Sequence, residues 1–377
     1  MKKILTIFYY SDIGPQHLYK DVGGIPLALA KYQGWDSDFA YVNFNGVIHN
    51  QDYEKYVHLV PIAKKGKPYF LVLKFLWKNA EKYDVVNMYH FNKTTLLACV
   101  IAKIRNSKVK FYLKCDMGRN SITELLKKNK LVRMMGTNLL YKMNLFPDVL
   151  TVETKKYVNV LNQYAKGRMK YLPNGFWGDI PGVEDKDIPK EKIVLNVGRL
   201  EAYQKNIQLL IEAYAKIPAI VRKDWKLVLI GSHNQAIDNV VTKVIQDDSS
   251  LDGKIIFTGK IDDKILLNKY YKRAAIYALT SRDESFGISL LEALHQADFP
   301  VVTDCCDAFF DMLDEGKIGC IVPNKDTVKY SNALISAMQN YSHTLADGEK
   351  SKTYVDQQFD YKIIAKDLNR YLKNTAM

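Results

Sequence analysis

The strongest constraint on the fold is the alternation of short apolar runs with amphipathic helical stretches. In the C-terminal half each run is rich in Val, Ile or Leu, ends in a small or polar residue and is followed by a helical pattern. Such alternation is typical of βα units, which build parallel sheets with loops at their carboxyl ends. The strands predicted in this half are residues 192–198, 225–231, 254–259, 275–281 and 299–304.

The N-terminal half has the same alternation in a less regular form. Its predicted strands are residues 2–10, 38–44, 83–89, 109–116 and 148–153. Residues 361–374 show the helical spacing of Ile363, Ile364, Leu368 and Leu372, so we expect a docked helix at the end of the chain. The predicted fold class is therefore α/β, with two doubly wound, Rossmann-like sheets.

A chain of 377 residues is too long for one ordinary hydrophobic core. Residues 176–192 are rich in Gly, Pro and charge and lack apolar periodicity, which predicts a linker near residue 180. We expect one domain over 1–180, a second over 181–358, and a C-terminal helix over 359–377 that docks back toward the first domain. Two facing domains of this kind would form a cleft where their strand orders reverse.

The charge of the chain is divided unevenly. Residues 1–180 hold 28 Lys and Arg against 13 Asp and Glu, whereas the whole chain holds 54 against 41. All of the excess positive charge therefore lies in the first half. This polarity indicates that one domain faces a polyanion or an anionic membrane.

The apolar runs also bear on location. None approaches the roughly 18 residues that a membrane span needs, and the first lacks a signal-peptide cleavage site, so it predicts a buried strand. The five cysteines form neither a C-x-x-C pair nor an even disulfide framework, and the seven histidines show no metal spacing. We therefore expect a cytoplasmic protein with reduced thiols.

The segment DESFGISLLEAL, after the fourth strand of the C-terminal half, is the strongest candidate for chemistry. It has Glu284 and Glu292 on either side of Gly287. A helix that begins near Gly287 would offer free N–H groups and a positive dipole end to a diphosphate. Those N–H groups belong to Gly287, Ile288 and Ser289. Glu284 could then accept from sugar hydroxyls and Glu292 from a ribose diol. By spacing alone, a capping carboxylate and a solvated helix Glu explain the pair equally well.

The stretch VGRLEAYQKN, after the first strand of the same half, favours the phosphate site. Arg199 can neutralise a diphosphate through bidentate contact and Lys205 can do so as a point charge. Two cations in one carboxyl-end loop and a helix N-terminus in another make a coherent anion site.

Together these segments resemble the retaining glycosyltransferases of family four, the glycosyl transferases group 1, which adopt the GT-B fold of two facing Rossmann-like domains. The resemblance extends across most of the chain. It is also carried by PNGF at 173–176, LVLIGSHN at 227–234, IIFTGKID at 255–262 and CDAFFDMLDEGKIGCIVP at 306–323. The last of these resembles the stretch where the family closes over its donor.

The resemblance implies roles for individual residues. Arg199 and Lys205 would bind the diphosphate of a nucleoside-diphosphate sugar, and Glu292 its ribose. Glu284 would contact the transferred sugar and support the anomeric centre, with backbone contacts from Gly287 and Ile288. Residues 1–180 would bind the acceptor and residues 181–358 the nucleotide sugar, a UDP-hexose being favoured.

The segment DVGGIP at 21–26 matches the family's Gly-Gly loop. Gly23 and Gly24 would let the backbone approach a donor phosphate or the acceptor closely, and Pro26 suits the first turn of a helix. An ordinary strand-to-helix turn is the alternative.

The sequence departs from the family at the end of VKFYLKCD, where many members have a His. The polar residues here are Lys114 and Asp116, and Asp116 is our candidate for a polar group beside the reacting centre. His90, after the strand 83–89, is the other candidate, although a lone His is more often structural. No Asp-x-Asp follows a strand as a metal clamp would. We therefore expect transfer without a metal or other cofactor, with the two cations and the helix stabilising the leaving nucleoside diphosphate.

Residues 64–82 and 121–144 are both basic and amphipathic. Such helices can lie on an anionic membrane, or they can be packing helices with a solvated basic face. A glycan or polyprenyl-diphosphate-linked acceptor would explain the charge, and would place the enzyme at the inner face of the plasma membrane, in bacterial surface polysaccharide or glycan synthesis.

Three other functions are open to a chain of this kind. The pI of 9.2 suggests a nucleic-acid-binding protein, but we find no base-reading motif and expect no nucleic acid. A sugar-nucleotide epimerase shares the GT-B architecture and lacks an acceptor. A nicotinamide dehydrogenase is disfavoured because no G-x-G-x-x-G follows any strand.

Overall fold

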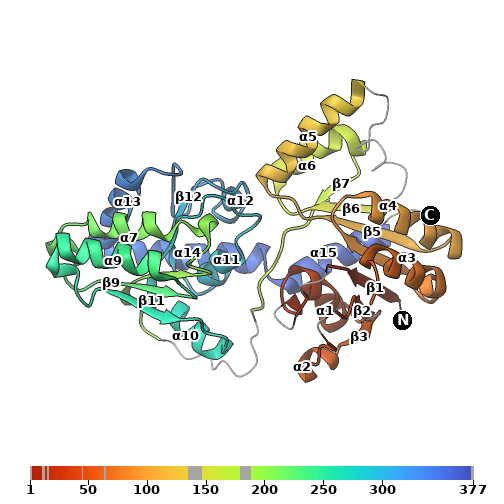
Figure 1. The fold of residues 1–377 in the computed structure, drawn as a ribbon, viewed down its shortest axis with the longest axis horizontal. Helices are drawn as coiled ribbons and strands as arrows, with labels where there is room; N and C mark the ends of the chain where they lie inside the picture. Colours follow the sequence, from red (N-terminus) through yellow and green to blue (C-terminus); the bar gives the residue numbers. More distant parts are fainter. Residues whose placement is uncertain are drawn as a thin grey trace. The chain divides into compact units, whose positions relative to one another are not determined.

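The computed structural model describes residues 2–10, 13–14, 17–44, 46–62, 65–134, 147–178 and 188–374. The chain divides into an N-terminal unit, Met1–Gly175 with Phe359–Met377, and a C-terminal unit, Phe176–Gln358. Each unit is a parallel sheet covered by helices (Figure 1), so the predicted architecture of two Rossmann-like domains is confirmed. Among the described residues, no helix has both the length and the apolar character that a membrane crossing requires.

The N-terminal unit is built on a seven-stranded sheet of parallel strands in the order β3-β2-β1-β4-β5-β6-β7. Its strands are β1 (Lys3–Phe8), β2 (Asp36–Tyr41), β3 (Val57–Pro61), β4 (Val85–Tyr89), β5 (Lys110–Cys115), β6 (Val149–Val152) and β7 (Met169–Tyr171). Its helices are α1 (Asp21–Gln33), α2 (Gln51–Glu54), α3 (Pro68–Asn79), α4 (Lys93–Arg105), α5 (Arg119–Met134), α6 (Lys155–Ala165) and α15 (Tyr361–Asn374). The strand order reverses between β1 and β4, which is where doubly wound sheets open a crevice at their carboxyl ends.

The C-terminal unit repeats this plan with a six-stranded parallel sheet in the order β10-β9-β8-β11-β12-β13. Its strands are β8 (Glu191–Val197), β9 (Lys226–Ile230), β10 (Ile255–Gly259), β11 (Ala274–Leu279), β12 (Phe299–Thr303) and β13 (Cys320–Val322). Its helices are α7 (Ile207–Ala215), α8 (Ala219–Arg222), α9 (Gln235–Asp247), α10 (Lys264–Arg273), α11 (Ile288–His295), α12 (Ala308–Met312), α13 (Thr327–Gln339) and α14 (Tyr341–Gln358). Here the order reverses between β8 and β11.

Every strand that the sequence predicts is present, and within the described residues three more occur at sheet edges: β3, β7 and β13. The predicted linker 176–192 is too long at its C-terminal end, because β8 already begins at Glu191. The boundary predicted near residue 180 lies outside the described residues.

Helix α15 returns to the N-terminal unit and packs against α1 (Figure 1). Its buried face includes Ile364, Leu368 and Leu372. At the contact, α1 carries Gly24, where a Cβ would lie only 2.5 Å from the Tyr361 ring. The glycine therefore allows α1 and α15 to approach closely.

Candidate functional site

Two loops meet where the strand order of the C-terminal unit reverses. The first follows β8 and the second follows β11. The backbone N–H of Arg282 donates to the Gln204 carbonyl at 2.7 Å, and Thr280 Oγ1 donates to the Asn206 carbonyl at 3.1 Å. The Arg282 guanidinium also lies 4.2 Å from the centre of the Tyr203 ring. These contacts hold together the loops that carry most of the predicted donor-site residues.

Lys205 and Glu284, one from each loop, form an ion pair. Lys205 Nζ lies 2.5 Å from Glu284 Oε1, and the Ser281 hydroxyl donates to the same oxygen at 2.7 Å. The side chains of Lys205 and Glu284 are only 20% and 13% exposed. In the part of the chain that the structure describes, Glu284 Oε2 accepts no hydrogen bond. One oxygen of this fixed carboxylate is therefore left for a hydroxyl group of a ligand.

Helix α11 begins directly after this loop, as the sequence predicts. Gly287 is its N-cap, with φ 94° and ψ 57°, a left-handed conformation that suits glycine. A Cβ at this position would lie 2.6 Å from the Phe309 ring. The first N–H groups of a helix have no acceptor within it, so those of Ile288 and Ser289 can bind an anion at the positive end of the dipole.

Glu292 lies in the second turn of α11 and is half-buried. Its Oε2 accepts a hydrogen bond from the Tyr271 hydroxyl of α10 at 3.1 Å. Burial and the charge of Glu292 raise the pKa of Tyr271, so the hydroxyl remains a donor. The Ser289 side chain is hydrogen-bonded with Tyr277, so its contribution to an anion site comes from its backbone N–H.

Arg199 is exposed at the start of the loop after β8. Gly198, its neighbour, lies beneath the Lys205 side chain, where a Cβ would be 3.4 Å from Lys205 Cε. The structure thus brings Lys205, Glu284 and the start of α11 together. Arg199 shares the loop, but no hydrogen bond or ion pair within the described residues joins its side chain to them.

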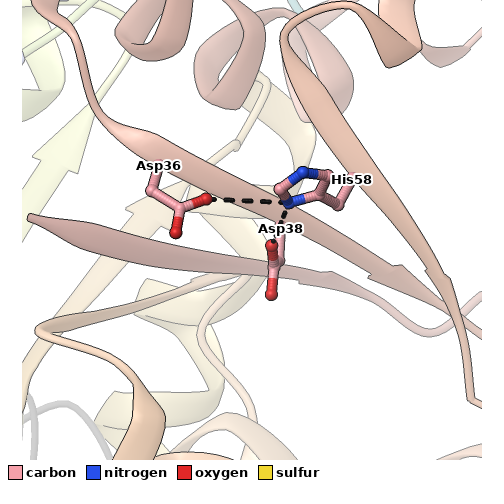
Figure 2. Close-up of side chains that lie close together, drawn as sticks. All are labelled: Asp36, Asp38 and His58. Carbon is pink, nitrogen blue, oxygen red and sulfur yellow. Dashed lines mark hydrogen bonds and ion pairs between the residues drawn. The ribbon is translucent and has the colours of Figure 1, made fainter. Parts of the chain in front are cut away.

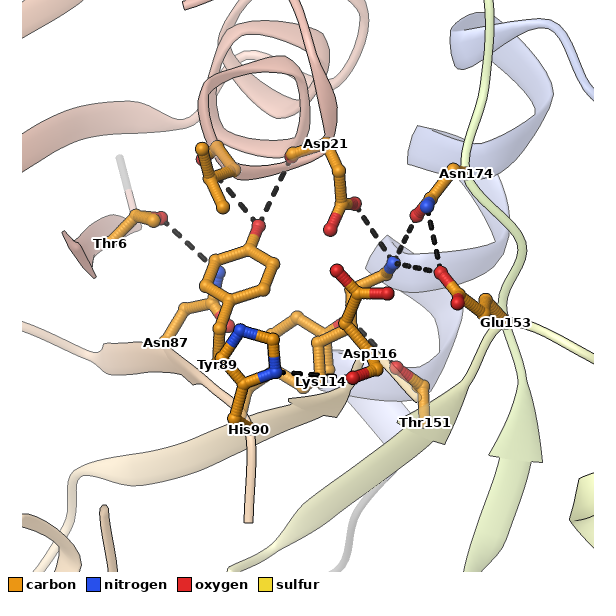
Figure 3. Close-up of polar contacts among 12 residues, drawn as sticks. Thr6, Asp21, Asn87, Tyr89, His90, Lys114, Asp116, Thr151, Glu153 and Asn174 are labelled. Carbon is orange, nitrogen blue, oxygen red and sulfur yellow. Dashed lines mark hydrogen bonds and ion pairs between the residues drawn. The ribbon is translucent and has the colours of Figure 1, made fainter. Parts of the chain in front are cut away.

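A second polar cluster lies at the carboxyl edge of the N-terminal sheet (Figure 3). Lys114 on β5 is fully buried, and its Nζ lies 2.8 Å from Asp21 Oδ1 and 3.9 Å from Glu153 Oε2. The same ammonium donates to Asn174 Oδ1, and Asn174 Nδ2 donates to Glu153 Oε2 at 2.7 Å. The start of α1 and the ends of β5, β6 and β7 therefore converge on one lysine.

The protonation states in this cluster depend on burial and on the neighbouring charges. Burial raises the pKa of Glu153, and the nearby charge of Asp116 raises it further. Burial also raises the pKa of Asp21, against the opposing effect of Lys114. Burial lowers the pKa of Lys114, but the carboxyls around it outweigh this and its net pKa is raised. The raised pKa values favour a charged Lys114 beside a neutral Glu153.

His90 and Asp116 are joined at the same edge. His90 has a left-handed backbone conformation, with φ 62°, and its backbone N–H donates to the Lys114 carbonyl at 3.0 Å. His90 Nδ1 lies 3.1 Å from the Asp116 carbonyl, which can only accept, so Nδ1 carries the hydrogen. A neutral His90 therefore keeps a lone pair on Nε2. Nε2 and the half-buried Asp116 carboxyl are two groups that can take a proton.

The predicted glycine loop is part of a helix. Gly24 lies in the first turn of α1, and Pro26 lies in the second turn, not the first. The Tyr89 hydroxyl lies 3.5 Å from the Val22 carbonyl, which has no N–H partner at Pro26. The space beside Gly24 is filled by Tyr361, so packing alone accounts for this glycine. Its role beside a ligand stays a prediction.

Asp36, Asp38 and His58 form a third group, near the amino ends of β2 and β3 (Figure 2). His58 Nδ1 lies 3.0 Å from Asp38 Oδ1 and 3.6 Å from Asp36 Oδ1. Their side chains are of the kinds that bind metal ions, but the Lys3 ammonium lies 3.2 and 3.4 Å from the same two carboxylates. Sequence spacing missed the group because strand register, with Asp38 opposite His58, brings its members together.

Sequence reasoning also missed the partners of the predicted site residues. Asp21, Glu153 and Asn174 surround Lys114, and Tyr271 holds Glu292. The available signal was Lys114 itself, a cation inside the apolar run of a strand that is buried over nearly its whole length. A buried cation needs anionic or carbonyl partners, but local sequence does not say which ones.

We compared the chain with known proteins. Residues 191–340 match the family model described as glycosyl transferases group 1. A phosphatidyl-myo-inositol mannosyltransferase of Mycobacterium leprae is 26% identical over 49% of this chain and 47% of its own length. A lipopolysaccharide core biosynthesis mannosyltransferase of Rhizobium leguminosarum bv. viciae is 24% identical over 47% of this chain and 49% of its own length. The matched region thus spans about half the length of these relatives.

The solved structure of Anabaena Alr3699/HepE in complex with UDP and glucose is similar over almost the whole chain. It covers 99% of this chain and 100% of its own, with a TM-score of 0.68 and 16% sequence identity. At that identity the similarity concerns the fold.

Proposed function

We propose that this chain, whose residues 191–340 belong to the glycosyl transferases group 1 family, is a GT-B glycosyltransferase that uses a nucleoside-diphosphate sugar. The observation that carries the proposal is the Lys205–Glu284 ion pair next to the start of α11, where the strand order reverses. An ammonium and a helix N-terminus suit a diphosphate, and the unoccupied carboxylate oxygen suits a sugar hydroxyl.

The donor is assigned residue by residue. Lys205, Arg199 and the first N–H groups of α11 bind the diphosphate and stabilise it as it leaves. Glu292, which Tyr271 holds, binds the ribose. Glu284 Oε2 accepts from the transferred sugar and supports the anomeric carbon, and transfer proceeds with retention. Because these cations and the helix dipole stabilise the negative charge that develops on the leaving diphosphate, the reaction requires no metal ion.

The acceptor is assigned to the N-terminal unit, where His90 Nε2 and the Asp116 carboxyl can take the proton of an attacking hydroxyl. We favour a hexose from a UDP-sugar and a glycan or polyprenyl-diphosphate-linked acceptor, as in surface polysaccharide synthesis. The names of the similar proteins support this choice: one mannosyltransferase is named for phosphatidyl-myo-inositol, another for lipopolysaccharide core, and the Anabaena structure contains UDP and glucose.

The test is sugar transfer by the purified full chain. Hexoses linked to UDP, GDP, dTDP or ADP are mixed with a polyprenyl-diphosphate-linked monosaccharide, and nucleoside diphosphate release and the product's anomeric configuration are measured. We expect release from one donor, dependent on the acceptor and unchanged by EDTA, with retention. Glu284→Gln should lower turnover by about 100-fold while the donor KM changes little, and exposed Glu349→Gln should leave turnover unchanged.

Other outcomes would contradict parts of this account. Epimerised sugar nucleotide formed without an acceptor would make the chain an epimerase. Loss of turnover in EDTA would disprove the metal-free mechanism, and an inverted product would disprove retention.

A further inference from the structure

Helices α3 and α4 lie side by side on one face of the N-terminal sheet (Figure 1). Their inner faces share one hydrophobic core, which includes Val72, Leu76, Ala98, Cys99 and Ala102. Their outer faces expose large apolar side chains: Phe70 is 62% exposed, Trp77 50%, Leu97 48% and Ile104 64%. Single exposed apolar residues are ordinary, but four on two adjacent helices form a surface that needs an explanation.

These four side chains belong to one surface. Phe70 and Trp77 are seven residues apart on α3, and Leu97 and Ile104 are seven apart on α4, so each pair forms a stripe along its helix. The Arg105 guanidinium of α4 lies 5.2 Å from the centre of the Trp77 ring of α3. This contact joins the two stripes into what we call the α3–α4 face.

The charged residues of α3 and α4 all have the same sign. The two helices contain five Lys and Arg residues and no Asp or Glu. Lys103 and Arg105 form ion pairs with residues outside these helices. The other three, Lys74, Lys78 and Lys93, are exposed among the apolar side chains. Basic and apolar groups on one helical surface are typical of binding at a membrane interface.

A hollow of about 200 Å³ lies beside α3. It is lined by Ile62, Leu71, Lys74, Phe75, Lys78 and Asn79. Two lysines next to three apolar side chains match the two chemistries of an anionic lipid, a phosphate group and a hydrocarbon chain. The hollow shares Lys74 and Lys78 with the exposed surface, and both features suit the same partner.

We propose that the α3–α4 face docks on a membrane rich in anionic lipid, with its apolar stripes in the interface and its lysines on lipid phosphates. A second copy of the chain is disfavoured because two faces of the same positive sign repel each other. Nucleic acid is disfavoured because Leu97 and Ile104 offer neither hydrogen bonds nor aromatic stacking. The docking is independent of sugar transfer, and its test uses no donor.

The test is sedimentation of the full chain with vesicles of phosphatidylglycerol and phosphatidylcholine in equal parts, or of phosphatidylcholine alone. We expect binding to the anionic vesicles only. Lys74→Glu combined with Lys78→Glu should weaken this binding by more than about tenfold. Lys216→Glu combined with Lys243→Glu makes the same charge change on the C-terminal unit and should weaken it far less.

The apolar contribution is tested separately. Phe70→Ala combined with Ile104→Ala removes two highly exposed side chains and should weaken vesicle binding by about tenfold or more, whereas Ile220→Ala, at an 81% exposed position of the C-terminal unit, should not. Anionic vesicles should also shift the tryptophan emission to the blue, and Trp77→Phe should remove that shift.

Three results would overturn the proposal. The first is no binding to anionic vesicles at low salt. The second is equal weakening by both charge-reversal pairs, which would mean unspecific attraction. The third is duplex DNA binding that needs the same lysines while vesicle binding is unaffected by the apolar substitutions, which would assign the α3–α4 face to nucleic acid.

Discussion

Lys114 shows how the chain balances charge where there is no water. Moving an ammonium out of water costs several kcal/mol unless close partners replace its hydration. Here Asp21 and Asn174 contact it directly, and Glu153 lies slightly farther away. Burial raises the pKa of Glu153 and favours its neutral form, so Asp21, 2.8 Å from the ammonium, provides the counter-charge. The result is a rigid junction beside His90, at the edge where we place the acceptor.

This balance predicts a large effect from one substitution. Lys114→Met leaves Asp21 buried without its counter-charge and should lower the free energy of unfolding by about 3–5 kcal/mol at pH 8, measured by urea denaturation. In the variant the pKa of Asp21 rises further. The Asp21 carboxyl of the folded variant therefore gains a proton as the pH falls, while the unfolded chain still holds it ionised. The loss of unfolding free energy relative to the wild type should therefore be smaller at pH 5 than at pH 8. Exposed Lys108→Met is the control. Equal urea midpoints for the two variants would contradict this account of the cluster.

At the scale of elements, the donor site depends on the sharp change from loop to helix at Gly287. This residue is left-handed, and the Phe309 ring of α12 fills the space where a side chain would be. Helix α11 can therefore begin close to the Lys205–Glu284 pair. The helix start and the ion pair are held by different contacts, so they can be separated by mutation.

Gly287→Ala tests this dependence. The substitution adds left-handed strain and a clash with Phe309, so we expect a loss of about 1–3 kcal/mol in unfolding free energy and weaker nucleoside diphosphate binding. Gly253→Ala is the matched control, because Gly253 has φ 67° but nothing within 4 Å of its missing Cβ. The measurement is urea denaturation with and without nucleotide. If nucleotide raises the unfolding free energy of Gly287→Ala as much as that of the wild type, the start of α11 takes no part in binding.

The elements differ in how well the sequence predicts them. The central strands are buried on both faces and read as continuous apolar runs, so their existence and type follow from sequence. β3, β7 and β13 lie at sheet edges and are only partly buried, and their apolar runs are short or interrupted. Side-chain contacts between strands, such as Lys114 with Glu153 or Asp38 with His58, depend on strand order and register. Local sequence patterns do not predict either of these.

At the scale of the whole molecule, the chain leaves the N-terminal unit and later returns to it. Helix α14 belongs to the C-terminal unit, and α15, three residues further on, completes the N-terminal one. Trp35 Nε1 donates to Asn369 Oδ1 at 3.2 Å, and Asn369 Nδ2 donates to Gln33 Oε1 at 2.7 Å, which ties α15 to the end of α1. Neighbouring residues near the end of the chain should therefore stabilise different units.

Ile364→Ala and Val355→Ala test this division, because both positions are buried and lie nine residues apart. Ile364→Ala leaves a cavity beside Gly175 and should cost about 2–5 kcal/mol, raising hydrogen exchange in the N-terminal unit. Val355→Ala, a smaller truncation, should raise exchange in the C-terminal unit alone. Faster exchange in the same unit for both variants, followed by mass spectrometry, would refute the division.

The central claim is that a nucleoside diphosphate binds where β8 and β11 end, and calorimetry tests it most directly. UDP, GDP, dTDP and ADP are titrated into the full chain, into Lys205→Ala and Glu292→Ala, and into Lys260→Ala as an exposed control. We predict that one nucleotide binds the wild type, that either site substitution weakens it by about tenfold or more, and that Lys260→Ala does not. No heat with any nucleotide, or equal affinity in all four proteins, would contradict the assignment of the donor site.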